Sequence, residues 1–267
     1  MVAVAILFLA LGPVSVSRAE AFNPLEMLFK ISKKAVMGTG SIPVYNQIEN
    51  QAKEPVQTKP AAKKIAPEIK VDPKDIEREA EFASKVTGIR KDFLMGSLVM
   101  ESKLGQNIGG CTYKEVEFGA RDSYQKGLLG AKAWETFKSR QRIIKDLAED
   151  LGYNYEDLKV SCNPPASLYA GTGGALGVPQ FMPDTWLEYK DRIAVIVGKE
   201  NPDPWDVRDG VVAMALKLSD VPGVSQHNVW SERNASKLYL SGTTSWRYDW
   251  YANEIQYWAR NYFNLIG

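Results

Sequence analysis

The 267-residue sequence has few of the residues that metal sites and nucleophilic hydrolases need. It contains one histidine, His227, and two cysteines, Cys111 and Cys162. The single histidine excludes any Ser-His-Asp site that does not use His227, and the shortage of ligands disfavours most zinc sites. His227 lies in a polar stretch, residues 225–228, so we expect a loop or helix-start residue with no chemical role. No metal and no cofactor are expected.

An excess of charge of one sign is also missing. The formal net charge is +1, with lysines and carboxylates interspersed. Nucleic acid is therefore not expected as a partner, because its binding requires a basic face. The composition, 45% apolar and 24% charged, is that of a globular protein long enough to bury a core, and it favours one main domain.

The N-terminus carries an apolar run, Met1 to Leu11, followed by Ser17-Arg18-Ala19, which resembles a signal-peptidase site. We therefore predict a signal peptide over residues 1–19 and export to the periplasm, the cell envelope or the outside. No Lys or Arg precedes the run. A short buried helix or an anchor that keeps the protein near the membrane is the alternative, although the run is shorter than the ~20 residues that span a bilayer.

Export would place the two cysteines in an oxidising compartment, where Cys111 and Cys162 are expected to form one disulfide. Closing that loop contributes about 4 kcal/mol in the chain-entropy model. Two buried free thiols are the alternative.

Proline and charge separate the N-terminus from the rest of the chain. Residues 49–71 are rich in Lys, Glu, Pro, Ala and Gln, and prolines at 55, 60 and 67 prevent a persistent helix. We predict an N-terminal segment and linker over residues 20–71 and the functional domain over residues 72–267.

Helical periodicity dominates that domain, so the expected fold class is mainly α with little strand. Residues 106–130 and 153–180 are expected to be long irregular loops, which are usually functional. The predicted helices are Pro73–Val86, Lys91–Leu104, Ala131–Leu151, Pro183–Val197, Asp206–Ser219, Val229–Leu240 and Arg247–Phe263.

Glu101 is the strongest catalytic candidate. It lies on a predicted helix that is apolar on nearly every side. A carboxyl buried there would have a raised pKa and could act as an acid near neutral pH. The alternative is a half-solvated residue in the last helical turn, paired with Lys103 or Arg90.

A second candidate segment is glycine-rich and covers residues 173–186. It has neither the Gly-Lys-Ser/Thr of a Walker loop nor the spacing of a dinucleotide fingerprint, so phosphate binding is disfavoured. A turn that leads into a Pro-started helix could instead place Gln180 against a neutral polymer, with Phe181 and Met182 packed below.

The segment Gly-Ala-Leu-Gly-x-x-Gln-Phe-Met-Pro-x-x-Trp, residues 174–186, resembles the glycan-binding motif of lytic transglycosylases, and most of all the membrane-bound lytic transglycosylase B family, whose fold is lysozyme-like. Glu101-Ser102-Lys103-Leu104-Gly105 matches the segment that carries the catalytic glutamate of that family. Residues 204–209, Pro-Trp-Asp-Val-Arg-Asp, resemble its Trp-Asp helix start. The similarity covers roughly residues 75–262.

This resemblance implies a set of substrate-binding residues around Glu101. They are Ser102, Tyr169, Thr172, Gly177, Gln180, Phe181, Met182, Tyr239 and Tyr251. The chain departs from the family at Leu240, where Asn is usual, and Thr172 corresponds to the hydroxyl residue expected just before the glycine-rich motif. The loops around the two cysteines are particular to this chain.

The resemblance also implies the reaction and the partner. A monomer would bind peptidoglycan glycan strands and cleave the MurNAc-GlcNAc β-1,4 bond, with Glu101 as acid and then as base toward the C6 hydroxyl, leaving 1,6-anhydro-MurNAc ends. A hydrolytic muramidase would need a second carboxylate ~5 to 9 Å away. Its candidates are Glu115, Glu117, Asp122 and Asp184, which we expect to be surface acids. A non-catalytic glycan-binding module is the third possibility.

All seven tryptophans follow Glu101 in the sequence, and most are expected in the core. They are Trp134, Trp186, Trp205, Trp230, Trp246, Trp250 and Trp258.

Overall fold

The computed structural model describes residues 71–163 and 172–266. Contacts divide the chain into two units, residues 1–58 and 59–267, and the first lies outside the described residues. The predicted signal peptide and nearly all of the predicted linker therefore stay predictions. Within the described part no helix is long and apolar enough to cross a membrane.

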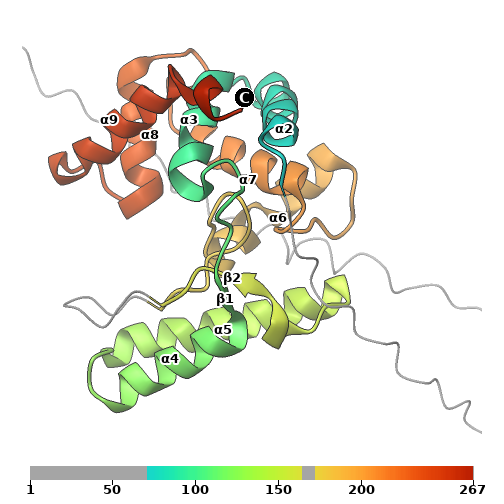
Figure 1. The fold of residues 1–267 in the computed structure, drawn as a ribbon, viewed down its shortest axis with the longest axis vertical. Coiled ribbons are helices and arrows are strands. Elements are labelled where there is room, and N and C mark those ends of the chain that lie inside the picture. Colours follow the sequence, from blue (N-terminus) through green and yellow to red (C-terminus); the bar gives the residue numbers. More distant parts are fainter. Residues whose placement is uncertain (1–70, 164–171, 267) are drawn as a thin grey trace, which may run out of the picture. The chain divides into compact units, whose positions relative to one another are not determined.

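The second unit is mainly helical with little strand, as predicted (Figure 1). Two short strands, β1 and β2, pair antiparallel, with Cys111 opposite Val160 and Thr112 opposite Lys159. The elements are α2 Pro73–Thr87, α3 Lys91–Ser102, β1 Cys111–Thr112, α4 Tyr113–Gln125, α5 Ala131–Leu151, η1 Tyr155–Asp157, β2 Lys159–Val160, α6 Pro183–Val197, α7 Val207–Ser219, α8 Val229–Ser241, η2 Trp246–Tyr248, α9 Asp249–Ala259 and η3 Tyr262–Leu265.

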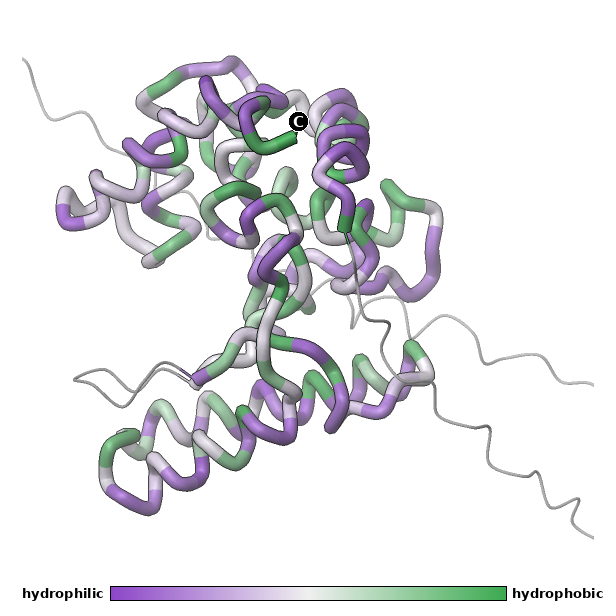
Figure 2. The backbone as a smooth tube through the Cα atoms, in the orientation of Figure 1, coloured by the Kyte–Doolittle hydropathy of each residue, from purple (hydrophilic) through white to green (hydrophobic). Residues whose placement is uncertain are grey.

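Helix α7 forms the centre of the core, since every residue from Asp209 to Leu216 is buried. It packs on α2, while α3 packs on α9. Gly96 permits the second contact, because a Cβ there would lie 2.4 Å from the Ile255 carbonyl oxygen of α9. Helices α4 and α5 lie side by side and alternate hydrophilic and hydrophobic residues, as expected for helices with one exposed face (Figure 2).

Helices α2, α7 and α8 differ from the prediction by one residue at one end, residues 153–180 contain η1 and β2, and three differences are larger. Helix α4 lies inside residues 106–130, which were predicted to be irregular, and it begins at a capping box formed by Thr112 and Glu115. The predicted C-terminal helix is broken into η2, α9 and η3, with Asn261 at a non-helical φ of −133°. Helix α3 ends at Ser102 and not at Leu104.

The predicted disulfide is confirmed. Cys111 of β1 is bonded to Cys162, two residues after β2, across a separation of 51 residues. The bond and the strand pairing together fasten the α4 and α5 region to the segment that leads toward Gln180.

Candidate active site

Glu101 lies in the last turn of α3, where the backbone changes direction sharply. Lys103 and Leu104 follow with φ values of 50° and 54°, and Gly105 with 79°. Positive φ is unfavourable for non-glycine residues and persists only where the surroundings enforce it. The enforcing contacts here are the fully buried Leu104 side chain and the Ser102 hydroxyl, which donates to the Leu98 carbonyl and accepts from the Gly105 N–H.

The Glu101 carboxyl is held by the Tyr251 hydroxyl of α9, which donates a hydrogen bond to Oε1. Burial raises the pKa of Glu101 to about 7, although the Tyr251 hydrogen bond and the charge of Lys217 both act to lower it. Burial and the nearby carboxylate raise the pKa of Tyr251 well above its usual range, so Tyr251 stays a donor. Glu101 pairs with neither Lys103 nor Arg90, and Arg90 instead binds Glu232.

The glycine-rich segment reaches Glu101 by extending the small sheet. Val160 of β2 bridges to Leu176, and Leu176 bridges back to Phe181, so residues 177–180 form a tight turn. Gly177 has a φ of 55°, and a Cβ there would lie 1.8 Å from the Pro204 carbonyl oxygen. Only glycine fits this position, so its place in the motif has a steric reason.

Gln180 lies at the end of that turn with a φ of 51°. Its Nε2 donates to the carbonyl oxygens of Ile108, at 3.1 Å, and of Gly177, at 2.7 Å. Both amide hydrogens are thereby used, and within the described residues Oε1 has no hydrogen-bond partner. The side chain therefore offers a fixed acceptor beside Glu101.

Glu101 and Gln180 line one cavity of about 340 Å³. Its other walls come from α6, α7 and α8 and from the residues just before α6. The Tyr239 hydroxyl donates to the Pro179 carbonyl, and the Tyr239 ring lies 5.7 Å from the ring of Phe181. The full lining is Glu101, Ala175, Gln180, Phe181, Met182, Thr185, Lys217, Tyr239 and Leu240.

The structure brings together five of the predicted site residues, namely Glu101, Gln180, Phe181, Met182 and Tyr239, with Tyr251 behind Glu101. Ser102 and Gly177 serve the backbone turns and are not part of the lining. Thr172 lies beside Asn163, whose Nδ2 donates to its carbonyl oxygen. Tyr169 lies outside the described residues.

Four lining residues were not predicted as site residues: Ala175, Thr185, Lys217 and Leu240. Lys217 is the important omission, since it brings a cation into the same cavity as Glu101. Its position on α7, among buried apolar residues, gave a helical pattern but no indication that the amine faces Glu101. Leu240 also lines the cavity, where the family resemblance predicted a polar amide.

None of the four candidate second carboxylates is part of this lining, and each has a partner of its own. Glu115 belongs to the capping box of α4, Glu117 pairs with Arg121, Asp122 with Lys126, and Asp184 with Arg140. Among the described residues Glu101 is the one carboxyl in the lining. The segment 164–171 contains no Asp or Glu.

Nothing in the described ranges gathers three or more potential metal ligands from His, Cys, Asp and Glu. His227 lies in the loop before α8, exposed, with Nε2 3.2 Å from the Gly88 carbonyl oxygen, in agreement with its prediction as a loop residue.

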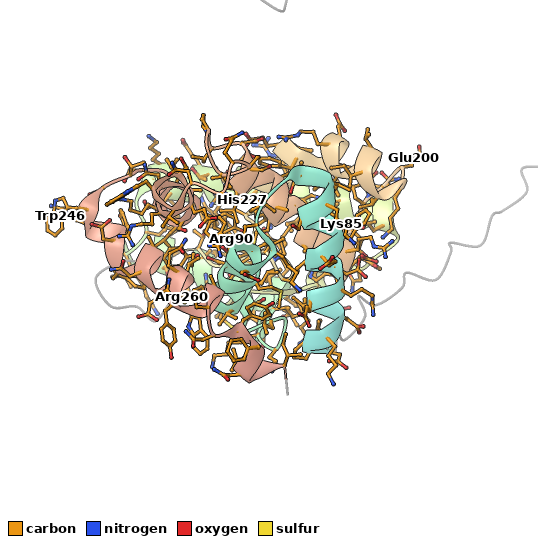
Figure 3. All side chains as sticks on the ribbon, turned by 90° about the horizontal axis from the view of Figure 1, so that it is seen from above. Lys85, Arg90, Glu200, His227, Trp246 and Arg260 are labelled. Carbon is orange, nitrogen blue, oxygen red and sulfur yellow. A yellow bond between two sulfur atoms is a disulfide. The ribbon has the colours of Figure 1, made fainter. Side chains whose placement is uncertain are left out.

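The prediction that most tryptophans are core residues is wrong. Trp186 and Trp205 are buried, and Trp134 and Trp258 are partly buried against the core. Trp230, Trp246 and Trp250 are exposed, and Figure 3 shows Trp246 projecting from the edge of the molecule. Trp250 packs edge-on against Tyr251 with ring centroids 5.6 Å apart. Because Tyr251 donates a hydrogen bond to Glu101, only Tyr251 separates the exposed Trp250 ring from Glu101.

No protein-family model matches the chain, and no curated protein matches it. Among solved structures, a 36 kDa muramidase/transglycosylase is 14% identical with a TM-score of 0.48, over 73% of this chain and 77% of that one. The Escherichia coli lytic transglycosylase Slt35 in complex with bulgecin A has the same identity and score, over 73% and 76%. The Pseudomonas aeruginosa soluble lytic transglycosylase SltB1 is 19% identical with a TM-score of 0.41, over 57% and 45%.

Proposed function

We propose that this protein is a lytic transglycosylase that cleaves the MurNAc-GlcNAc β-1,4 bond of peptidoglycan and leaves 1,6-anhydro-MurNAc ends. The observation that carries the proposal is the isolation of Glu101. It is the one carboxyl among the described residues that line the cavity, and burial raises its pKa to about 7. The motif resemblance around residues 101–105 and 174–186 gives independent support.

A pKa near 7 suits a residue that must donate a proton and then accept one. Glu101 gives its proton to the glycosidic oxygen as the bond to C1 of MurNAc breaks. The C6 hydroxyl of the same sugar then attacks C1 and returns its proton to Glu101. The products are a free hydroxyl on the leaving sugar and a 1,6-anhydro ring, and no water molecule is consumed.

The residues around Glu101 have roles that fit this chemistry. Tyr251 fixes the direction of the carboxyl, and the free Oε1 of Gln180 can accept a hydrogen bond from a sugar hydroxyl or amide. Phe181 and Tyr239 provide apolar ring surface in the lining, of the kind that sugar rings contact.

We further infer that residues 72–267 form the catalytic domain of an exported, monomeric protein that acts in the periplasm or cell envelope. The Cys111–Cys162 disulfide supports this location, because such bonds persist in oxidising compartments.

Mass spectrometry of purified peptidoglycan, digested with the protein and in parallel with its Glu101→Gln variant, tests the function. We expect fragments that end in 1,6-anhydro-MurNAc from the wild type and a loss of at least about 1000-fold in their rate of formation from the variant. Asp122→Asn, which changes a surface carboxyl of α4, serves as the control and should retain full activity. Reducing ends would indicate a hydrolase, and intact glycan with every protein would indicate a binding module.

A further inference from the structure

Lys217 of α7 is half-buried and brings a cation into the Glu101 cavity. Its amine lines the Glu101 cavity, with Nζ 5.4 Å from the centroid of the Phe181 ring and 5.4 Å from that of the Tyr239 ring. Within the described residues it makes no ion pair and no hydrogen bond, and it interacts with carboxylates only through space. The two rings stabilise the ammonium through cation–π contacts, and a negative charge in the same cavity would stabilise it further.

The charged and titratable groups around Lys217 come from four elements. Glu101 faces it from α3, Asp184 and Glu188 from α6, Tyr239 from α8, and Tyr251 contacts Glu101 from α9. Burial lowers the pKa of Lys217, while Glu188, Asp184 and Glu101 act to raise it. Asp184 is already paired with Arg140, and Asp184 and Glu188 are both exposed, so Glu101 is the facing carboxyl that shares the cavity.

We propose that Lys217 is a positioning residue for Glu101, whose ammonium stabilises the carboxylate that forms each time Glu101 gives up its proton. The inference rests on the proposed function for its use in catalysis. No bond to Lys217 forms or breaks, and its proton stays in place. The ammonium acts through its fixed charge, which needs no reorganisation when the negative charge appears on Glu101.

Two opposing effects thus set the acidity of Glu101. Burial favours the protonated form, which the first step needs, and Lys217 with Tyr251 favours the ionised form, which the second step needs. Removing Lys217 would leave Glu101 a weaker acid, so proton donation would become slower while the fold and the cavity remain.

The test is a ¹³C NMR titration of the glutamate carboxyls in the full, substrate-free protein. In Lys217→Met we expect the pKa of Glu101 to rise by about 1, and in Lys217→Arg to stay near the wild-type value because the charge is kept. Lys190→Met is the matched control, since Lys190 of α6 pairs with Asp150 and is absent from the lining. An unchanged pKa of Glu101 in Lys217→Met would overturn the proposal.

The reciprocal titration covers the case in which Lys217→Met does not fold. Coupling between two groups is mutual, so Glu101→Gln must lower the pKa of the Lys217 amine in ¹⁵N-detected spectra. A Lys217 amine that titrates alike in wild type and Glu101→Gln refutes the pairing. Neither titration needs substrate. A digestion without anhydro products would therefore contradict the proposed function without contradicting the measured coupling between Glu101 and Lys217.

The pH dependence of kcat distinguishes an electrostatic role of Lys217 toward Glu101 from a purely structural role. Lys217→Met should move the alkaline limb of the kcat profile, which reports the loss of the Glu101 proton, toward higher pH, with Lys217→Arg restoring the wild-type profile and Lys190→Met leaving it unchanged. Equal losses at all pH values in both Lys217 variants would contradict the proposal.

Discussion

Helix α3 begins and ends beside a glutamate, and the two carboxyls have different surroundings. Near its start Arg90 donates to Glu232 of α8, with Nε 3.0 Å from Oε1 and Nη2 2.8 Å from Oε2, and Gln256 of α9 donates to the same carboxylate. At its end Glu101 has Tyr251 of α9 and a cation that does not touch it. The same three helices, α3, α8 and α9, contribute to both places.

The difference shows how an ion pair separates a structural carboxyl from one that can exchange its proton near neutral pH. Glu232 is fully buried, but a bidentate guanidinium and an amide satisfy its oxygens. Glu101 lacks a contacting cation, so burial raises its pKa to about 7 and its proton can leave and return near neutral pH. Both carboxyls are buried, so the missing ion pair, and not low solvent exposure, distinguishes the proposed acid Glu101 from Glu232.

The largest change in the free energy of unfolding is expected from removing the Glu232 carboxylate near the start of α3. Glu232→Gln removes the buried bidentate partner of Arg90, which keeps only the longer contact of 3.8 Å with Asp92, and should lower the free energy of unfolding by about 3 kcal/mol. Denaturant unfolding at neutral pH measures the change. Asp122→Asn, which removes an exposed pair with Lys126, should cost less than about 1 kcal/mol. Equal effects in the two variants would contradict the comparison.

A smaller change in the free energy of unfolding, of opposite sign, is expected from replacing Glu101 at the end of α3. Folded Glu101 keeps its proton up to about pH 7, whereas the unfolded chain loses it near 4.5, so the folded state binds more protons between these values. The free energy of unfolding therefore falls as the pH rises through this window. Glu101→Gln removes that penalty and should be more stable than wild type by about 2 to 3 kcal/mol at pH 8, and about equal to it at pH 4.

Thermal unfolding of both proteins at the two pH values checks this prediction. The control is Glu115→Gln, because hydrogen bonds from the Thr112 backbone and side chain lower the pKa of Glu115, and its loss should bring no gain at pH 8. A Glu101→Gln variant that is no more stable at pH 8 than at pH 4, relative to wild type, would mean that Glu101 ionises as an ordinary surface acid.

Periodicity and caps predicted most of the helices because those signals are local. Helix α5 runs from Ala131 to Leu151 and α6 from Pro183 to Val197, both with the predicted bounds. Helix α4 was missed although the capping box Thr112–Glu115 precedes it, since the apolar positions on that helix are few. The pairing of Cys111 with Cys162 followed from there being only two cysteines.

Contacts across long sequence separations could not be predicted in the same way. Glu101 and Tyr251 are 150 residues apart, and the family resemblance suggested Tyr251 without placing its hydroxyl on the carboxyl. Lys217 belongs to no motif, and its facing Glu101 depends on how α3 and α7 pack. Ser102 and Gly177 belong to the motifs because they make backbone turns possible. A motif match alone does not distinguish this role from contact with the substrate.

The central claim, that one carboxyl suffices because the sugar supplies its own nucleophile, is tested most directly by digesting peptidoglycan in H₂¹⁸O. Mass spectrometry of the fragments, against a sample without enzyme, detects any oxygen taken from water. The account predicts new 1,6-anhydro ends without ¹⁸O, because the C6 oxygen closes the ring. New reducing ends that carry ¹⁸O at each cleaved bond would contradict it and would require a water-activating group that the Glu101 cavity does not show among the described residues.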